Sequence, residues 1–152
     1  MTKPIKRHIA LQPWSKDHHY GLLLSWKIKK GFSLGIDPER IKKYTDWFWV
    51  NHLIPHFETE EQFVFPILGN DNSLVKQALA EHKQLKFLFE KEDAISDTLS
   101  KIETLLNNHI RFEERVLFNA IQEIANEKEV QILNKAHNGS EDFGLWDDEF
   151  WI

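Results

Sequence analysis

Residues 94–125 read AISDTLSKIETLLNNHIRFEERVLFNAIQEIA, and this stretch shows the helical pattern that recurs along the chain. Apolar side chains recur along it every three or four residues, from Ile95 to Ile124. That spacing is the period of an α-helix that buries one face. Two polar side chains, His109 and Glu113, occupy positions on the same apolar stripe. The stretch therefore predicts a long helix with polar groups on its buried face.

Other parts of the chain carry the same helical spacing. Gly and Pro are scarce, at six and five residues, so long stretches lack turn signals. The predicted helices cover about 15–30, 38–67, 73–90 and 94–125, with a shorter one over about 127–135. Four long helices joined by short loops predict an all-α fold, an antiparallel up-down four-helix bundle over about 14–125.

The remaining residues, about 126–152, are expected to form a C-terminal extension of the same single domain, 1–152. The extension contains the short helix, a predicted turn at 137–140 and an aromatic tail. The tail is expected to pack back on the bundle, because a patch of exposed aromatic side chains is a liability. Its aromatic residues are Phe143, Trp146, Phe150 and Trp151.

Local signals suggest where two of the helices begin and end. Ser15 is the predicted N-cap of the first helix, and Gly31 its left-handed C-cap. Asp37, followed by proline, is the predicted N-cap of the second helix. Pro55 lies inside the second helix and should kink it just before His56, because proline lacks the N–H that a helix interior needs.

Composition excludes several classes of function. In the 152 residues, 19 Lys and Arg against 24 Asp and Glu give a net charge of −5, so nucleic acid is not the expected partner. Cysteine is absent, which excludes disulfides, thiolate metal sites and a Cys nucleophile. The longest apolar run, residues 63–68, is too short to span a membrane, and the N-terminus shows no signal-peptide pattern. We expect a cytoplasmic protein, a monomer or weak dimer, with no membrane partner.

The polar residues on the apolar stripes point to metal binding. His56, His82 and His109 lie on the stripes of three different helices, and the first and last are followed four residues later by Glu60 and Glu113. Residues four apart share a helix face, so each pair can reach one metal. Buried charges without partners cost several kcal/mol, and a metal pair that coordinates them removes that cost.

The first helix supplies a fourth histidine, either His18 or His19, and the local spacing leaves this choice open. Imidazole and carboxylate donors without sulfur suit iron or manganese and also tolerate zinc. If Glu60 and Glu113 bridge two metals and each metal takes two histidines, each has four protein ligands. A bridging oxo or hydroxo group makes five and leaves one position open for a small molecule. None of the eight histidines has a glutamate three residues before it, which disfavours the ferritin-like di-iron class.

Taken as a set, four motifs resemble the hemerythrin-like, or HHE cation-binding, domains over about residues 14–125. These motifs are Asp17-His18, His56-x-x-x-Glu60-Glu61, Glu81-His82 and His109-x-x-x-Glu113-Glu114. The resemblance implies a four-helix bundle with a non-haem centre of two Fe ions, and it favours His18 over His19. The ligands that it implies are His18, His56, Glu60, His82, His109 and Glu113.

Two positions depart from the pattern of the oxygen-carrying hemerythrins. Those proteins have a second histidine where this chain has Lys86, and their last carboxylate is an aspartate five residues after the last histidine, whereas here it is Glu113, four residues after His109. The four-His, two-Glu set is closer to bacterial iron–sulfur-centre repair proteins of the same superfamily. We hypothesise that Lys86 points into the gap left by the missing histidine. His52 is expected in the core beside the site, and Glu61 and Glu114 are expected as ion-pair partners that face outward.

Three functions fit these residues. The first is a binding module, in which a di-iron site binds O2, NO or a related small ligand for sensing, storage or delivery. The second is an enzyme or iron-centre repair protein, which reduces peroxide or NO or donates iron. The third is a helical bundle that a metal such as zinc only stabilises. The open metal position favours the first two.

Overall fold

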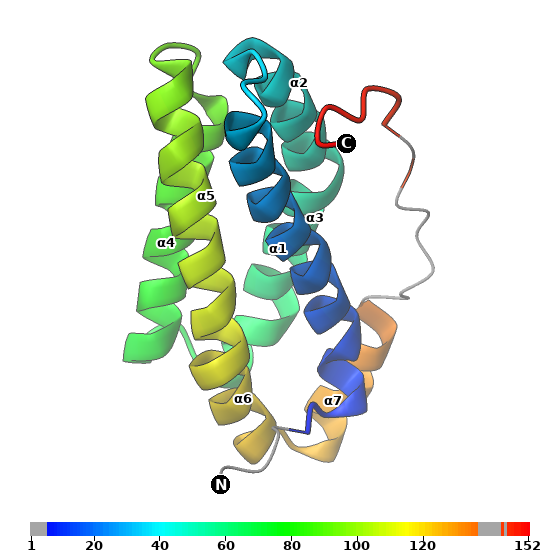
Figure 1. The fold of residues 1–152 in the computed structure, drawn as a ribbon. Coiled ribbons are helices and arrows are strands. Elements are labelled where there is room, and N and C mark those ends of the chain that lie inside the picture. The colour runs from blue at the N-terminus through cyan, green and yellow to red at the C-terminus, as the bar shows by residue number, and fades with distance from the viewer. Residues whose placement is uncertain (1–5, 137–143, 145) are drawn as a thin grey trace, which may run out of the picture.

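Helices make up the fold, which a computed structural model describes for residues 6–136, 144 and 146–152. No strand occurs in this part of the chain, so the all-α prediction is confirmed (Figure 1). Four long helical segments account for most of it. The first is α1 (Gln12–Ser33), preceded by the short turn η1 (Ile9–Leu11), and the third is α4 (Ser73–Glu90). The second comprises α2 (Pro38–Phe48), η2 (Trp49–Leu53), α3 (Ile54–Thr59), η3 (Glu60–Val64) and η4 (Phe65–Ile67). The fourth comprises α5 (Ile95–Phe112), η5 (Glu113–Leu117) and α6 (Phe118–Ile124), and α7 (Glu127–Ala136) follows it.

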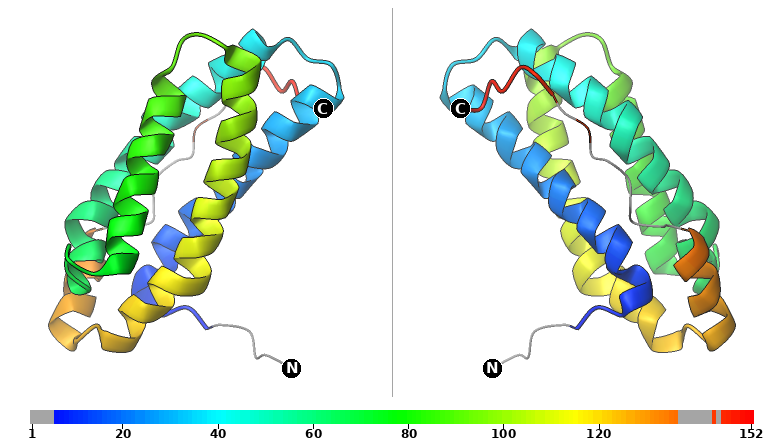
Figure 2. Two further views of the ribbon diagram at one scale, coloured as in Figure 1. Left: turned by 90° about the vertical axis from the view of Figure 1, so that its left-hand side faces the viewer. Right: turned by 90° about the vertical axis from the view of Figure 1, so that its right-hand side faces the viewer.

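The long segments lie side by side in all three views (Figures 1 and 2). The loops at 34–37 and 91–94 lie at one end of the molecule, whereas the loop at 68–72 and helix α7 lie at the other. Helix α1 packs closely against α5, and α4 packs against α5 on its other side. None of the described helices is both long and apolar enough to cross a membrane.

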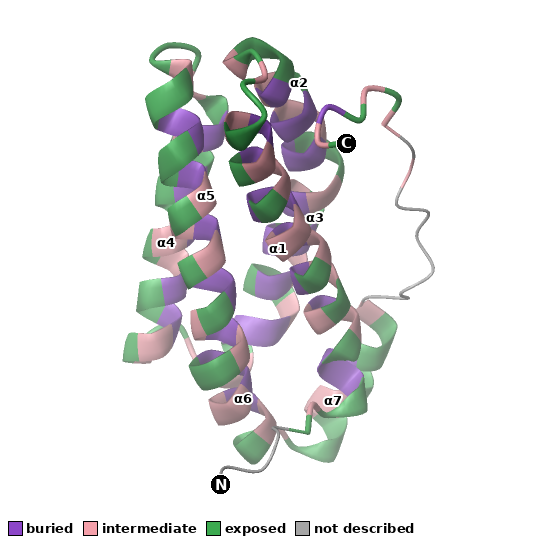
Figure 3. Cartoon of the chain, viewed as in Figure 1, coloured by how far each residue is buried: buried purple, intermediate pink, exposed green. Residues whose placement is uncertain are grey.

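Buried residues lie mainly on the sides of the helical segments that face the other segments (Figure 3). Within the described residues they form two apolar clusters. One cluster gathers around Tyr44 and Phe48, and the other around Trp14 and Phe118. Along each long segment, one or two buried polar residues lie where positions of one cluster give way to positions of the other.

Helix α1 begins earlier than the sequence suggested. Its first residue is Gln12 with Leu11 as N-cap, so the prediction of Ser15 as N-cap is wrong. Pro13 in the first turn accounts for the early start, because its fixed φ suits that position and it needs no hydrogen-bond acceptor. Ser15 lies inside the helix, and its hydroxyl donates to the carboxylate of Glu114 at 2.8 Å.

Gly31 is not the C-cap of α1, because the helix continues to Ser33. The left-handed residue after the helix is Gly35, at φ 71°. Gly31 serves close packing instead. A Cβ atom there would lie 2.7 Å from Ile41 and 2.9 Å from Phe150.

Asp37 caps α2 as predicted, since its carboxylate accepts the backbone N–H of Glu39 at 3.0 Å. The chain around Pro55 adapts through the π-helical turn η2, in which the N–H of Ile54 reaches the carbonyl of Trp49. The helical path therefore continues from η2 into α3, whose first turn contains Pro55.

The described part of the aromatic tail packs on the molecule as predicted. Phe150 is buried, and the rings of Trp146, Phe150 and Trp151 all lie within 5.8 Å of the ring of Tyr44. The ammonium group of Lys27 lies 3.8 Å from the centre of the Trp151 ring. Phe143 and the predicted turn at 137–140 lie outside the described residues.

Candidate metal centre

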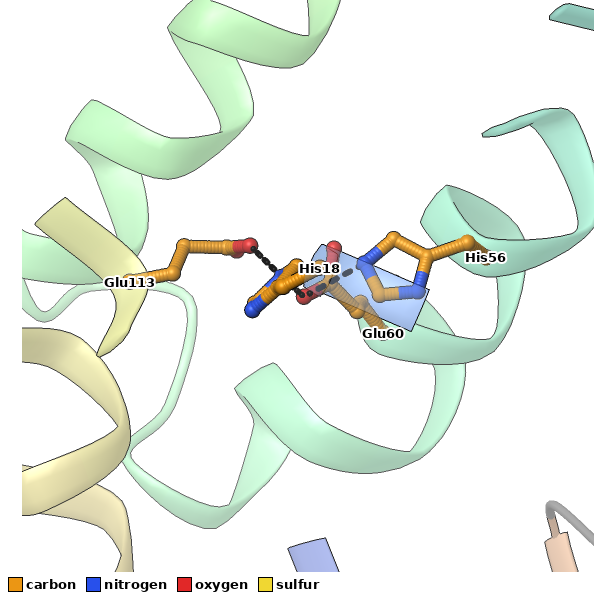
Figure 4. Close-up of side chains that lie close together, drawn as sticks. All are labelled: His18, His56, Glu60 and Glu113. Carbon is orange, nitrogen blue, oxygen red and sulfur yellow. Dashed lines mark hydrogen bonds and ion pairs between the residues drawn. The ribbon is translucent and has the colours of Figure 1, made fainter. Parts of the chain in front are cut away.

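The six residues predicted from the sequence come together in the middle of the molecule. Each is at most 4 % exposed, and the set is His18, His56, Glu60, His82, His109 and Glu113. In the described part of the chain they form two overlapping groups, and in each group one donor atom per residue lies within 4.8 Å of all the others. The first group is His18, His56, Glu60 and Glu113 (Figure 4). The second is Glu60, His82, His109 and Glu113.

Two glutamates belong to both groups, and each begins a π-helical turn. The turn η3 starts at Glu60 and η5 starts at Glu113. Both follow an α-helical histidine by four residues, so histidine and glutamate share a face. Apolar spacing alone did not reveal the π-turns. Such turns are frequent at functional sites, where they displace the side chains that follow from the regular helical track.

The two shared glutamates bridge the four imidazole rings. The two oxygens of Glu60 lie 3.2 Å from Nε2 of His56 and 3.2 Å from Nε2 of His82. One oxygen of Glu113 lies 2.9 Å from Nε2 of His18 and 3.3 Å from Nε2 of His109. Each carboxylate thus faces one histidine from each group, and all four Nε2 atoms point towards the same centre.

The outward nitrogen of every one of these histidines, Nδ1, lies at hydrogen-bond distance from a further carboxylate. The partners are Glu114 for His18 at 2.8 Å, Asp17 for His56 at 2.9 Å, Glu61 for His82 at 2.8 Å and Glu81 for His109 at 2.6 Å. An Nδ1–H that donates to a carboxylate leaves Nε2 free to bind a metal, which is the common arrangement of metal-bound histidine. Glu61 and Glu114 are ion-pair partners, as predicted, but their partners are the candidate ligands themselves.

The inner carboxylates govern the charge of the imidazoles. Burial alone would lower the pKa of His109, but the negative charges of Glu113 and Glu81 outweigh burial and raise the pKa to about 10. Burial is likewise outweighed at His56, where Glu60 and Asp17 raise the pKa to about 9. Without a metal, the nearby carboxylates therefore favour the protonated form of these two imidazoles.

Several buried donor atoms at this centre face one another in histidine–glutamate pairs but make no hydrogen bond within the described part of the chain. They are Nε2 of His56, His82 and His109, both oxygens of Glu60 and Oε2 of Glu113. A buried polar atom left without a partner costs about 1–3 kcal/mol. Cations coordinated between these atoms would satisfy them together, and the nitrogen and oxygen donors suit iron, manganese or zinc. The residues present therefore fit a pair of metal ions.

The other candidates from the sequence lie away from the centre. His19 is exposed, so His18 is the histidine that α1 presents inward. His52 belongs to neither group and lies beside the rings of Trp47 and Phe48. The hypothesis that Lys86 points into the site is wrong. Lys86 is exposed, because Leu85 occupies the inward position one turn after His82 and is fully buried there.

Aromatic rings complete the surroundings of the centre. Phe57 stacks on His82 with ring centres 3.8 Å apart, and Phe118 stacks on His18 at 5.2 Å. Each of these rings covers one face of an imidazole and keeps water from that face.

Comparison with known families agrees with this geometry. The family model described as the hemerythrin HHE cation binding domain matches residues 20–121, which is more than half of the chain. The chain belongs to this family. Five of the six candidate ligands lie within the matched residues, and His18 lies two positions before them. No curated protein and no solved structure matches the chain.

Proposed function

We propose that this chain is a non-haem di-iron protein that binds O2, NO or a related small ligand, on an antiparallel up-down four-helix bundle. One observation carries the proposal: two groups of four buried donors share the carboxylates of Glu60 and Glu113. Shared carboxylates hold two metal ions close together. A single-metal site would need only one of the two groups.

The proposed roles follow from the two groups. His18 and His56 would hold one iron, His82 and His109 would hold the other, and both would share Glu60 and Glu113. An oxo or hydroxo group is the proposed third bridge, and manganese or zinc are the alternative metals. When bound, the iron pair would supply an open coordination position and redox chemistry for a small ligand. With four protein donors each, both metals are left short of six ligands.

The protein's own contribution is position and exclusion of water. Hydrogen bonds from Nδ1 hold the rings with Nε2 inward, and the stacked rings of Phe57 and Phe118 cover two of them. In a dry site the electrostatic attraction between carboxylates and cations is stronger than in water. A small neutral molecule such as O2 or NO enters such a site at less cost than a charged substrate.

The first test is metal content together with the visible spectrum of the protein made in iron-rich medium, with and without azide. We expect about two irons per chain and absorption bands that shift with azide. His18→Gln should lose iron, whereas His19→Gln should not, because His19 is exposed on the same helix. One zinc or no metal, with no visible band, would overturn the proposal.

Kinetics then separate the binder from the alternative, a di-iron enzyme or iron-centre repair protein. A binder forms a stable adduct with its ligand and returns to its starting spectrum when the ligand is removed. An enzyme consumes peroxide or NO, and a repair protein loses iron to an acceptor. Turnover of peroxide or NO at a rate above that of the His18→Gln variant would favour the enzyme.

A further inference from the structure

The four outer carboxylates make interhelical contacts that follow one rule. Each lies next in sequence to a candidate metal ligand, yet it bonds the histidine of a different helical segment. Asp17 of α1 bonds His56 of α3, and Glu61 of η3 bonds His82 of α4. Helix α4 makes the equivalent contact with α5, and the turn η5 makes it with α1.

These contacts close into a ring within the described part of the chain. Glu81 of α4 bonds His109 of α5, and Glu114 of η5 bonds His18 of α1, the segment with which the series began. Every long segment therefore gives a donor to the centre and also holds the histidine of the next segment. The orientation of each imidazole depends on the packing of two helices.

The members of the ring differ in exposure to water. The side chain of Glu81 is 19 % exposed and lies 2.6 Å from its histidine, whereas that of Glu61 is 45 % exposed and lies 2.8 Å away. Asp17 and Glu114 are intermediate, at 32 % and 31 %. Water screens an exposed charge more strongly than a buried one, so the four carboxylates are not equivalent.

We propose that Asp17, Glu61, Glu81 and Glu114 are positioning residues that set the metal affinity of the centre, with Glu81 contributing most and Glu61 least. The inference rests on the proposed function, since it assumes that the histidines bind metal. Each carboxylate fixes the Nδ1–H tautomer, directs Nε2 inward and increases the electron donation of the ring. Loss of such a partner typically lowers metal affinity by about 10–100-fold.

The test compares Glu81→Gln, Glu81→Leu and Glu61→Gln with Glu58→Gln as the matched control. Glu58 is exposed on α3 and is two residues from His56, so its replacement removes the same charge without touching the ring. Affinity for Co2+ and Fe2+ is measured by competition with a coloured chelator. We expect Glu81→Gln to weaken binding by about 10-fold or more, Glu81→Leu further still, and Glu61→Gln least of the three.

A second readout separates positioning from a merely structural role. The ligand-field spectrum of bound Co2+ depends on the orientation and donor strength of the imidazoles, so it should change in Glu81→Gln and stay constant in Glu58→Gln. Thermal unfolding of the metal-free variants reports whether each still folds. If Glu81→Leu does not fold, the comparison of Glu81→Gln with Glu58→Gln still tests the positioning role of Glu81.

Specific results would overturn the inference. Wild-type affinity and spectrum in Glu81→Gln, in a chain whose wild type binds two metals, would refute the positioning role and leave the proposed function intact. A larger loss in Glu61→Gln than in Glu81→Gln would refute the ranking by burial. A wild type that binds no metal would refute the proposed function and this inference with it.

Discussion

Replacing Glu60 by glutamine is expected to remove both metals at once, whereas replacing His109 by glutamine should remove only one. Glu60 is fully buried and its two oxygens lie 3.2 Å from a histidine of each group, so the amide withdraws a charged donor from both metals. His109 belongs to the second group alone. The His109→Gln variant therefore keeps the four donors of the first group.

The magnitude follows from the kind of contact that is lost. Loss of a hydrogen-bond partner behind a ligand already costs about 10–100-fold in affinity. Loss of a donor that binds the metal directly should cost more than about 100-fold, or about 2.7 kcal/mol per metal. Glutamine matches glutamate in shape, so the packing around Glu60 should survive the substitution.

Metal content measured after gel filtration, at matched protein concentration, gives the stoichiometry. We expect two metals per chain in the wild type and in His19→Gln, one in His109→Gln and none in Glu60→Gln. Far-ultraviolet circular dichroism shows whether each variant remains helical. A helical Glu60→Gln variant that retains two metals at wild-type affinity would refute the bridging role, and loss of both metals from His109→Gln would show that the two groups do not bind independently.

Three further predictions concern stability and titration. Gly31→Ala should lower the free energy of unfolding by about 1–3 kcal/mol, because the added Cβ would clash with Ile41 and Phe150. Urea unfolding measures this change, and unchanged stability would show that the two neighbours move aside without cost. Burial raises the pKa of Tyr44 to about 12. The stability that this group contributes is therefore present below about pH 10 and is lost as the pH rises through about 12. Absorbance at 295 nm should show that Tyr44 ionises only at this high pH, and Tyr44→Phe should abolish that signal. Removing metal with a chelator should lower the melting temperature, since ions at about 100 times their dissociation constant stabilise the fold by about 2.7 kcal/mol, and an unchanged melting curve would argue against a metal in the folded state.

Local sequence signals predicted the helices well wherever the cause of the structure was itself local. The third long helix was expected over about 73–90 and is Ser73–Glu90, with the side chain of Asn72 accepting the N–H of Leu74 at its start. Periodic apolar positions and a capping side chain act within a few residues, so they can be read directly. The boundaries of α1 were less accurate, because Pro13 and the packing at Gly31 outweighed the signals at Ser15 and Gly31.

The candidate ligands could also be predicted from the sequence, because a histidine and a glutamate four residues apart share a helix face. His56 with Glu60 and His109 with Glu113 were predicted from that spacing together with their positions on the apolar stripes. The choice between His18 and His19 did not follow from the spacing. It depended on how α1 is rotated about its axis, which the packing of α1 against α5 sets.

The sequence by itself thus determined an all-helical chain with imidazoles and carboxylates on its buried faces. Only the tertiary structure decided which carboxylate bonds which histidine. A residue next to an inward donor is turned by about 100° around the helix, so its side chain can reach a neighbouring helix instead of the centre. Which neighbour it meets depends on the order of the helices in space, and the spacing within any single helix does not contain that information.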